Sequence, residues 1–202
     1  MRGHVDFVGQ YVSDLSDVIE TILKLKPNGQ LILAGHSMGG GILQQYAMRD
    51  EPSKVDAYLL FAPVVGMDFP ESTPPDHISI HMGRALGILV MQKLGIHTFD
   101  TMPVVRLGVP MFPGHINEYS LNAARSMRPQ NYKEAFASLT EPTLFILGEN
   151  DTVGGVKTQN IAQEIQSHSN AKVQIIPNEH HHVQNNPNAI TTVAQWLEEI
   201  LP

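Results

Sequence analysis

Residues 30–41 read Gln-Leu-Ile-Leu-Ala-Gly-His-Ser-Met-Gly-Gly-Gly, and the interpretation of the whole chain starts from this stretch. Its first five residues are almost wholly apolar, which predicts a short buried strand from Gln30 to Ala34. A helical pattern follows from Ile42 to Arg49, so the glycine-rich residues between strand and helix form a sharp turn. Ser37 lies in the middle of that turn, where its hydroxyl would project from the edge of a sheet.

The segments on either side of this turn alternate between helix and strand. Helical spacing of apolar residues predicts helices at 8–25, 156–167 and 189–201, and short apolar runs predict further strands at 55–62, 143–147 and 172–176. Such alternation predicts an α/β fold, with a mostly parallel sheet and helices on both of its faces.

The segment from Val64 to Ser138 interrupts the alternation. Prolines recur along it, and short helices such as Ile80–Leu94 are expected between them. We therefore predict a core built from residues 1–63 and 139–202. Residues 64–138 would be inserted as a helical lid at the carboxyl edge of the sheet, where ligands bind in open α/β folds.

The composition excludes several other classes of protein. The chain has 202 residues, 42% of them hydrophobic and 16% charged, which fits one globular domain. A net charge of −7 argues against a nucleic-acid partner. Without cysteine there is no disulfide and no thiolate nucleophile. No apolar run is long enough to span a membrane, and no signal peptide is recognisable at the start, so a cytoplasmic protein is expected.

The turn around Ser37 meets the requirements of a nucleophile elbow. A serine hydroxyl is a weak nucleophile and needs a base, together with hydrogen-bond donors for the oxyanion. Gly35 and Gly39 are small enough to let strand and helix approach, with His36 completing the turn. The Met38 N–H at the start of the helix is the expected oxyanion donor. The alternative is a glycine-rich turn with an idle serine.

An acid should follow the nucleophile along the chain. Asp151 comes just after the buried strand at 143–147, in a turn that would hold its carboxylate at the sheet edge. The alternative role for Asp151 is to cap its own loop by a local hydrogen bond. Glu149 and Asp68 are weaker candidates for the same acid.

A base is expected from the run His180-His181-His182, which follows the last strand. Only one imidazole is needed, with one ring nitrogen facing Ser37 and the other facing Asp151. No cysteine or acidic residue accompanies the run at a recognisable metal-ligand spacing. Neither a metal nor a cofactor is therefore expected.

Three segments resemble one enzyme family. Residues 35–40 resemble the nucleophile elbow of α/β-hydrolases. Residues 2–7 and 11–15 resemble the segment ahead of it in the monoacylglycerol lipase and lysophospholipase branch, also described as serine aminopeptidase-like. Residues 142–151 are similar to that branch's acid-bearing strand and turn. In this branch a proline often falls seven residues after the catalytic histidine. Pro187 therefore favours His180 as the base, with His181 and His182 as alternatives.

The resemblance also implies a departure. In the family the elbow follows the fifth strand of an eight-stranded sheet, whereas only 36 residues precede Ser37 here, with one helix among them. We therefore expect an N-terminally truncated form of the fold, without the first four strands and without the loop that donates the second oxyanion hydrogen bond. The strand at 31–34 would become an apolar edge, which favours a homo-oligomer paired through it.

The leading hypothesis is a serine hydrolase that cleaves carboxylic esters, lipid-like or small, through a Ser-His-Asp triad and an acyl-enzyme. Its partner would be a small-molecule acyl ester. An amide or peptide hydrolase with the same triad is the alternative within enzymes. A catalytically weak remnant that acts as a binding or assembly subunit is the alternative outside them.

Overall fold

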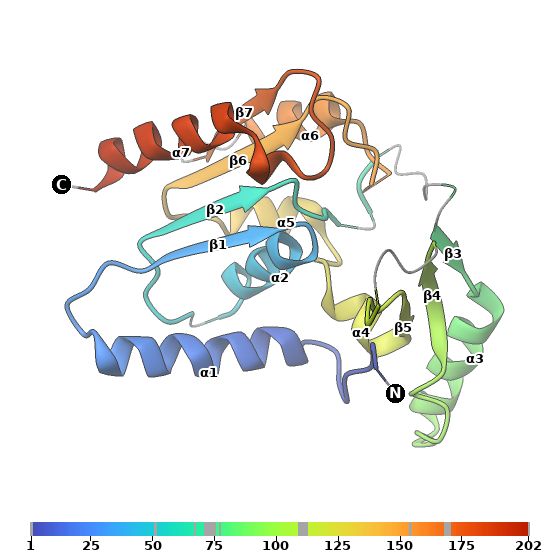
Figure 1. Cartoon of the computed structure of the whole chain (residues 1–202). Helices are drawn as coiled ribbons and strands as arrows, with labels where there is room; N and C mark the ends of the chain where they lie inside the picture. The colour runs from blue at the N-terminus through green and yellow to red at the C-terminus, as the bar shows by residue number, and fades with distance from the viewer. Residues whose placement is uncertain are drawn as a thin grey trace.

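A four-stranded parallel sheet forms the centre of the protein. The computed structural model describes residues 2–50, 52–66, 68–70, 76, 78–108, 113–153, 155–167 and 171–201. The strands are β1 (Ile32–His36), β2 (Ala57–Phe61), β6 (Thr143–Gly148) and β7 (Ala171–Ile176), in the order β1-β2-β6-β7 with every neighbouring pair parallel (Figure 1). The predicted parallel sheet is confirmed.

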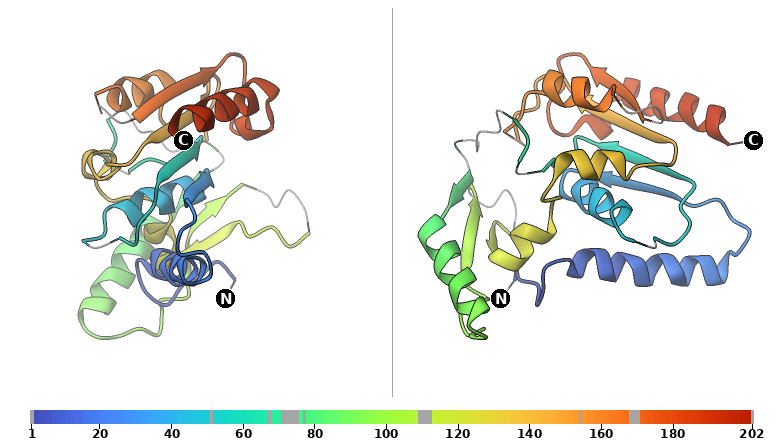
Figure 2. Two further views of the ribbon diagram at one scale, coloured as in Figure 1. Left: turned by 90° about the vertical axis from the view of Figure 1, so that its left-hand side faces the viewer. Right: turned by 180° about the vertical axis from the view of Figure 1, so that it is seen from behind.

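Helices cover both faces of this sheet (Figure 2). One face packs against α1 (Gln10–Leu25), α2 (Met38–Ala47), α5 (Tyr132–Ala137) and α6 (Thr158–Ile165). The opposite face packs against α7 (Pro187–Ile200), which buries Ala189 and Trp196. Because β6 is covered on both sides, all six of its residues are buried, as expected for a central parallel strand.

The strand that leads into the elbow lies closer to the C-terminus than the predicted strand Gln30–Ala34. It ends at His36 rather than at Ala34, because Gly35 and His36 still pair with Leu60 and Phe61 of β2. The parallel pairing therefore continues up to the residue that precedes Ser37. The position of the serine at the end of the strand follows from this register.

Residues 78–126 form a second, smaller layer that the sequence predicted only in part. The expected helix at 80–94 is present as α3 (Met82–Lys93), and α4 (Leu121–Ser126) is a further short helix. Three strands were missed: β3 (Ile78–Ile80), β4 (Pro103–Leu107) and β5 (Glu118–Ser120) form an antiparallel sheet in the order β3-β4-β5. Figure 1 shows this layer beyond the carboxyl ends of β1 and β2. The inserted segment is therefore mixed rather than only helical.

Both ends of the segment predicted as a lid pack into the main core. Val65 and Phe69 near its start, and Tyr132 and Phe136 near its end, belong to the core cluster beneath the sheet. The part that builds its own small core is shorter and centres on Ala85, Ile88, Val104 and Leu121. The division at residues 64 and 138 stays a prediction.

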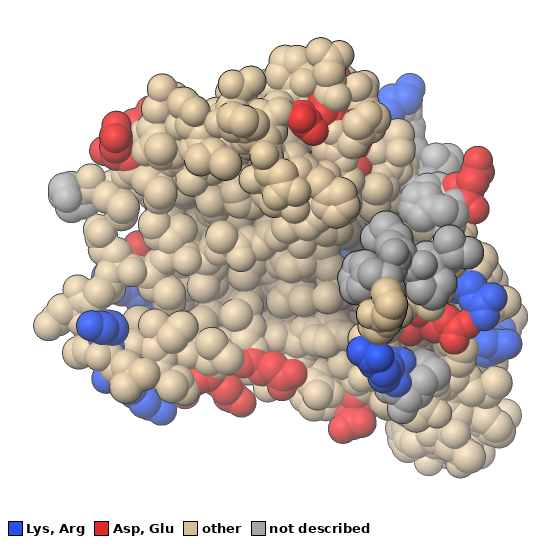
Figure 3. Space-filling model, viewed as in Figure 1, with Lys and Arg blue, Asp and Glu red and all other residues tan. Residues whose placement is uncertain are grey.

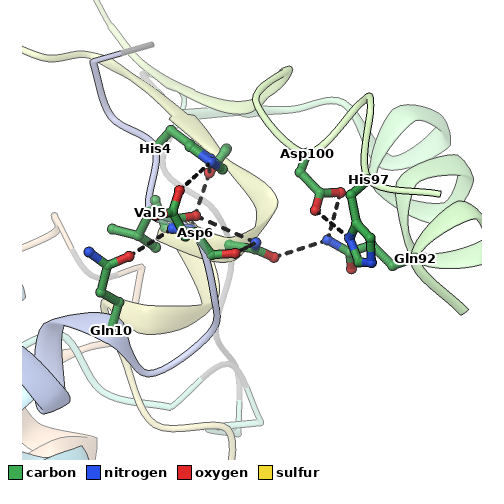
Figure 4. A network of polar contacts seen from close by, with 10 residues as sticks. His4, Val5, Asp6, Gln10, Gln92, His97 and Asp100 are labelled. Atoms are coloured by element: carbon green, nitrogen blue, oxygen red, sulfur yellow. Dashed lines mark hydrogen bonds and ion pairs between the residues drawn. The ribbon is translucent and has the colours of Figure 1, made fainter. Parts of the chain in front are cut away.

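A network of polar contacts ties the smaller layer to the N-terminal segment (Figure 4). The Asn122 side-chain amide donates to the Asp6 carbonyl at 2.9 Å, and its oxygen accepts from Gln92 at 3.1 Å. Gln92 also donates to Asp100 at 3.0 Å, and the Asp100 carboxylate lies 2.9 Å from His97 Nδ1. Asp100 is buried, so these contacts fix how α3 and the loop after it sit against residue 6.

The outer edge of β1 is open. In the described residues β1 pairs only with β2; Ala34 is exposed and Ile32 is half-buried. Figure 3 shows that the face over β1, between α7 and α1, is recessed and almost free of charged side chains. The predicted apolar edge is therefore present. Among the described helices, none is long and apolar enough to cross a membrane.

Candidate active site

Ser37 occupies a strained turn between β1 and α2. Its backbone has φ 55° and ψ −117°, a conformation that non-glycine residues rarely adopt. Hydrogen bonds hold it in place: its N–H donates to the Phe61 carbonyl at 3.0 Å, and its carbonyl accepts from Gly41 at 3.2 Å and Val64 at 3.0 Å. Strain that is held in this way is typical of a functional position.

The glycines around Ser37 have different roles. A Cβ at Gly35 would come within 2.6 Å of the Gly39 backbone, and one at Gly40 would come within 2.6 Å of Pro63. A Cβ at Gly39 would meet nothing within 4 Å. The steric requirement therefore falls on Gly35 and Gly40, and the expectation that Gly39 must be small for the same reason is wrong.

A serine, a histidine and an aspartate are hydrogen-bonded in series. His181 Nε2 lies 2.7 Å from Ser37 Oγ, and His181 Nδ1 lies 2.9 Å from Asp151 Oδ2. A carboxylate accepts, so Nδ1 carries the proton, and Nε2 is free to accept the serine O–H. The side chains of His181 and Asp151 are each 14% exposed. This limited contact with water strengthens the electrostatic interaction between them.

The choice of His180 from sequence is corrected by this geometry. His180 is exposed, and its Nδ1 lies 3.2 Å from the Asn150 carbonyl rather than near Ser37. His182 is also exposed and packs its ring edge-on against His181, with centroids 5.8 Å apart. The proline spacing selected the wrong member of the run, because the loop backbone and not the distance to Pro187 determines which ring faces the sheet.

The three acids considered from sequence have separate partners. Asp151 uses one carboxylate oxygen for His181 and the other to accept the Val153 N–H at 2.9 Å, so it also has the loop-capping role considered as an alternative. Glu149 accepts the Asn178 N–H at 2.8 Å. Asp68 accepts the Tyr132 N–H at 3.0 Å. Of the three, only Asp151 is hydrogen-bonded to the histidine beside Ser37.

Backbone contacts bring together the acid turn, which carries Asp151, and the loop that carries His181. The Asn150 N–H donates to the Glu179 carbonyl at 2.8 Å, and Asn178 adopts a left-handed conformation with φ 60°. Gly148 lies so close to the loop that a Cβ there would come within 2.2 Å of the His180 carbonyl oxygen. The loop after β7 is therefore pressed against the end of β6, with the His181 ring directed toward Ser37.

A backbone N–H donor lies next to Ser37 at the start of α2. Met38 is the first residue of α2, so its N–H has no acceptor within the helix and is available at the helix N-terminus. Across the described ranges, no group of three or more His, Asp or Glu side chains is arranged to hold a metal ion. The chemistry that this arrangement can perform is attack by an activated serine.

Sequence reasoning placed His36 in the elbow turn but predicted no contact for its side chain. Its Nε2 lies 2.8 Å from the His181 carbonyl, and its ring packs against the His181 ring with centroids 4.7 Å apart. Its place beside Ser37 was the only available signal, because no spacing rule links residues 36 and 181.

The fold and the serine turn define an α/β-hydrolase. The family model for serine aminopeptidase, S33, matches residues 1–107. The chain belongs to this family.

Known proteins similar to the chain include lipases. The chain is 23% identical to a monoacylglycerol lipase of Mycolicibacterium smegmatis, over 97% of this chain and 72% of that protein. The crystal structure of the Paleococcus ferrophilus monoacylglycerol lipase matches with a TM-score of 0.67 and 15% identity, over 98% of this chain and 77% of the other. A lipase in an open form matches with a TM-score of 0.64 and 16% identity, over 94% of this chain and 71% of that one.

Proposed function

We propose that the protein is a serine esterase that cleaves carboxylic esters through an acyl-enzyme. Ser37 would be the nucleophile, His181 the base and Asp151 the residue that orients the base. The observation that carries the proposal is the hydrogen-bonded series from Ser37 Oγ to His181 Nε2 at 2.7 Å and from His181 Nδ1 to Asp151 at 2.9 Å.

In this proposal His181 removes the proton of Ser37 as the serine oxygen attacks the ester carbonyl. The Asp151 carboxylate stabilises the imidazolium that forms, and the Met38 N–H donates to the oxyanion. The imidazolium then gives its proton to the leaving alkoxide, which departs as the alcohol. Water, activated by the same imidazole, attacks the acyl-enzyme and releases the acid and free Ser37.

Lipid-like or small acyl esters are the proposed substrates. Two of the similar proteins are named monoacylglycerol lipases. The smaller layer also exposes Met82, Leu86 and Val90 on α3, spaced four residues apart. An apolar stripe of this kind supports a lid that contacts an apolar substrate or its surface.

Hydrolysis of p-nitrophenyl esters of increasing acyl length tests the proposal. Wild-type protein should hydrolyse them, and Ser37→Ala should lower kcat by at least about 1000-fold without loss of folded structure, because the nucleophile is removed. Turnover that is unchanged in Ser37→Ala would contradict the proposal. Folded wild-type protein without any ester turnover would instead favour a binding or assembly subunit.

We also propose that the open edge of β1 pairs with a second copy of the chain. The support is the unpaired outer side of β1 together with the recessed, nearly uncharged face beside it (Figure 3). An unpaired strand edge is a ready template for pairing with another strand.

A further inference from the structure

The loop that carries His181 has little regular structure of its own. It lies between the end of β7 at Ile176 and the 3-10 helix Val183–Asn185, and His180 and His182 on either side of His181 are exposed. A base on such a loop needs external contacts to stay within hydrogen-bonding distance of Ser37.

Contacts to the acid turn anchor one side of this loop. Glu149 accepts the Asn178 N–H at 2.8 Å, and the Asn150 N–H donates to the Glu179 carbonyl at 2.8 Å. These bonds hold the residues before His181. They do not fix the His181 peptide itself relative to the elbow.

His36 supplies that contact from the elbow side. Its Nε2 lies 2.8 Å from the His181 carbonyl oxygen. A carbonyl can only accept, so Nε2 must carry the proton and donate it. The neighbouring residues 36 and 37 thus hold His181 twice, once through its backbone carbonyl and once through its side chain.

The ring of His36 also packs in a cluster of three imidazoles. Its centroid lies 4.7 Å from that of His181 and 5.5 Å from that of His182. Burial lowers the pKa of His36, and the His181 and His182 rings lower it further, whereas the carbonyl hydrogen bond and Asp151 raise it. A neutral ring here adds no second positive charge beside the imidazolium that forms on His181 during acyl transfer.

We infer that His36 is a positioning residue: its Nε2–H holds the His181 carbonyl and keeps the base in line with Ser37. The inference rests on the hydrolysis proposed above. It extends the site by one residue, which acts on the reaction through His181 and does not touch the substrate.

Two substitutions separate the hydrogen bond from the ring. His36→Gln keeps an N–H donor near the position of Nε2, whereas His36→Phe keeps an aromatic ring of similar size and removes the donor. With p-nitrophenyl butyrate as substrate, His36→Phe should lose about 10- to 100-fold in kcat with KM within about twofold. His36→Gln should retain kcat within about threefold. His81→Phe and His81→Gln, at an exposed histidine whose side chain makes no capping hydrogen bond to α3, are the matched controls and should leave both constants unchanged.

Two results would overturn the inference: a kcat for His36→Phe equal to that of wild type, or an equal loss in His36→Phe and His36→Gln when both are folded. If wild type turns over the ester and Ser37→Ala does not, the proposed function holds, and the His36 variants then test the inference alone. Absent turnover in wild type would instead point to failure of that function.

A second measurement needs neither activity nor a variant. Long-range nitrogen–proton NMR correlations of wild-type protein at pH 8 report which nitrogen of His36 carries the proton. The inference requires the Nε2–H tautomer. The Nδ1–H tautomer would leave no donor for the His181 carbonyl and would overturn it, even if His36→Phe failed to fold.

Discussion

At the scale of single residues, the side chain of His181 links Ser37 to Asp151. One nitrogen is 2.7 Å from Ser37 and the other is 2.9 Å from Asp151. His180 and His182 are chemically identical to it and adjacent in sequence, yet neither makes these contacts. Geometry alone therefore distinguishes the three.

Replacing each histidine of the run by alanine tests this distinction. His181→Ala should lower kcat for ester hydrolysis by at least about 1000-fold, because it removes the proposed base. His180→Ala and His182→Ala should each retain activity within about tenfold. Steady-state kinetics on the three folded variants is the measurement. A similar loss in all three, or the largest loss in His180→Ala, would contradict the assignment.

Sequence could predict those residues of the site whose positions depend on a local sequence pattern. Ser37 follows from the strand-turn-helix signal, and Asp151 follows from its place after a buried strand. The choice among the histidines depends on the left-handed Asn178 and on the close approach of Gly148 to the His180 carbonyl. The approach of Gly148 to His180 is a contact between segments far apart in the sequence, and no local pattern encodes it.

At the scale of elements, the elbow shows how close packing of the backbone positions Ser37. β1 and α2 meet at Gly35 and Gly39. A Cβ at Gly35 would overlap the Gly39 backbone, whereas a Cβ at Gly39 would meet no atom within 4 Å. The pair allows a matched test, since both changes are glycine to alanine within five residues.

Gly35→Ala should destabilise the fold by about 1–3 kcal/mol, because its Cβ would overlap the Gly39 backbone. Gly39→Ala should stay within about 1 kcal/mol of wild type, since space is open and alanine favours the helix. Urea unfolding gives both values. Equal destabilisation by the two changes would show that the account of the elbow packing is wrong.

The strands of the main sheet were predictable and those of the smaller layer were not. Apolar runs such as Thr143–Gly148 identify strands because both faces are buried. Pro103–Leu107 contains only two buried apolar residues, Val104 and Val105, and begins with a proline. Its partners β3 and β5 have three residues each, too few for an alternating pattern to be visible.

At the scale of the whole molecule, the unpaired outer edge of β1 lies beside a recessed, nearly uncharged face (Figure 3). Many proteins protect such edges with charged side chains, particularly lysine. Ala34, which is exposed on β1, is the position at which that protection can be added.

Ala34→Lys should therefore weaken self-association. Wild-type protein should show a concentration-dependent dimer in light scattering coupled to size-exclusion chromatography, and the variant should remain monomeric over the same range. Gln174→Lys, which adds the same charge at an exposed position of the opposite edge strand β7, serves as the control and should leave the dimer unchanged. A monomeric wild type at all concentrations would contradict pairing through β1.

The most direct test of the central claim is covalent labelling with a fluorophosphonate, followed by peptide mapping by mass spectrometry. The account predicts a single adduct on Ser37 in the folded protein, lost after unfolding in urea and strongly reduced in His181→Ala. No adduct on folded wild-type protein, or an adduct at another serine, would contradict the claim that Ser37, His181 and Asp151 form a working nucleophile.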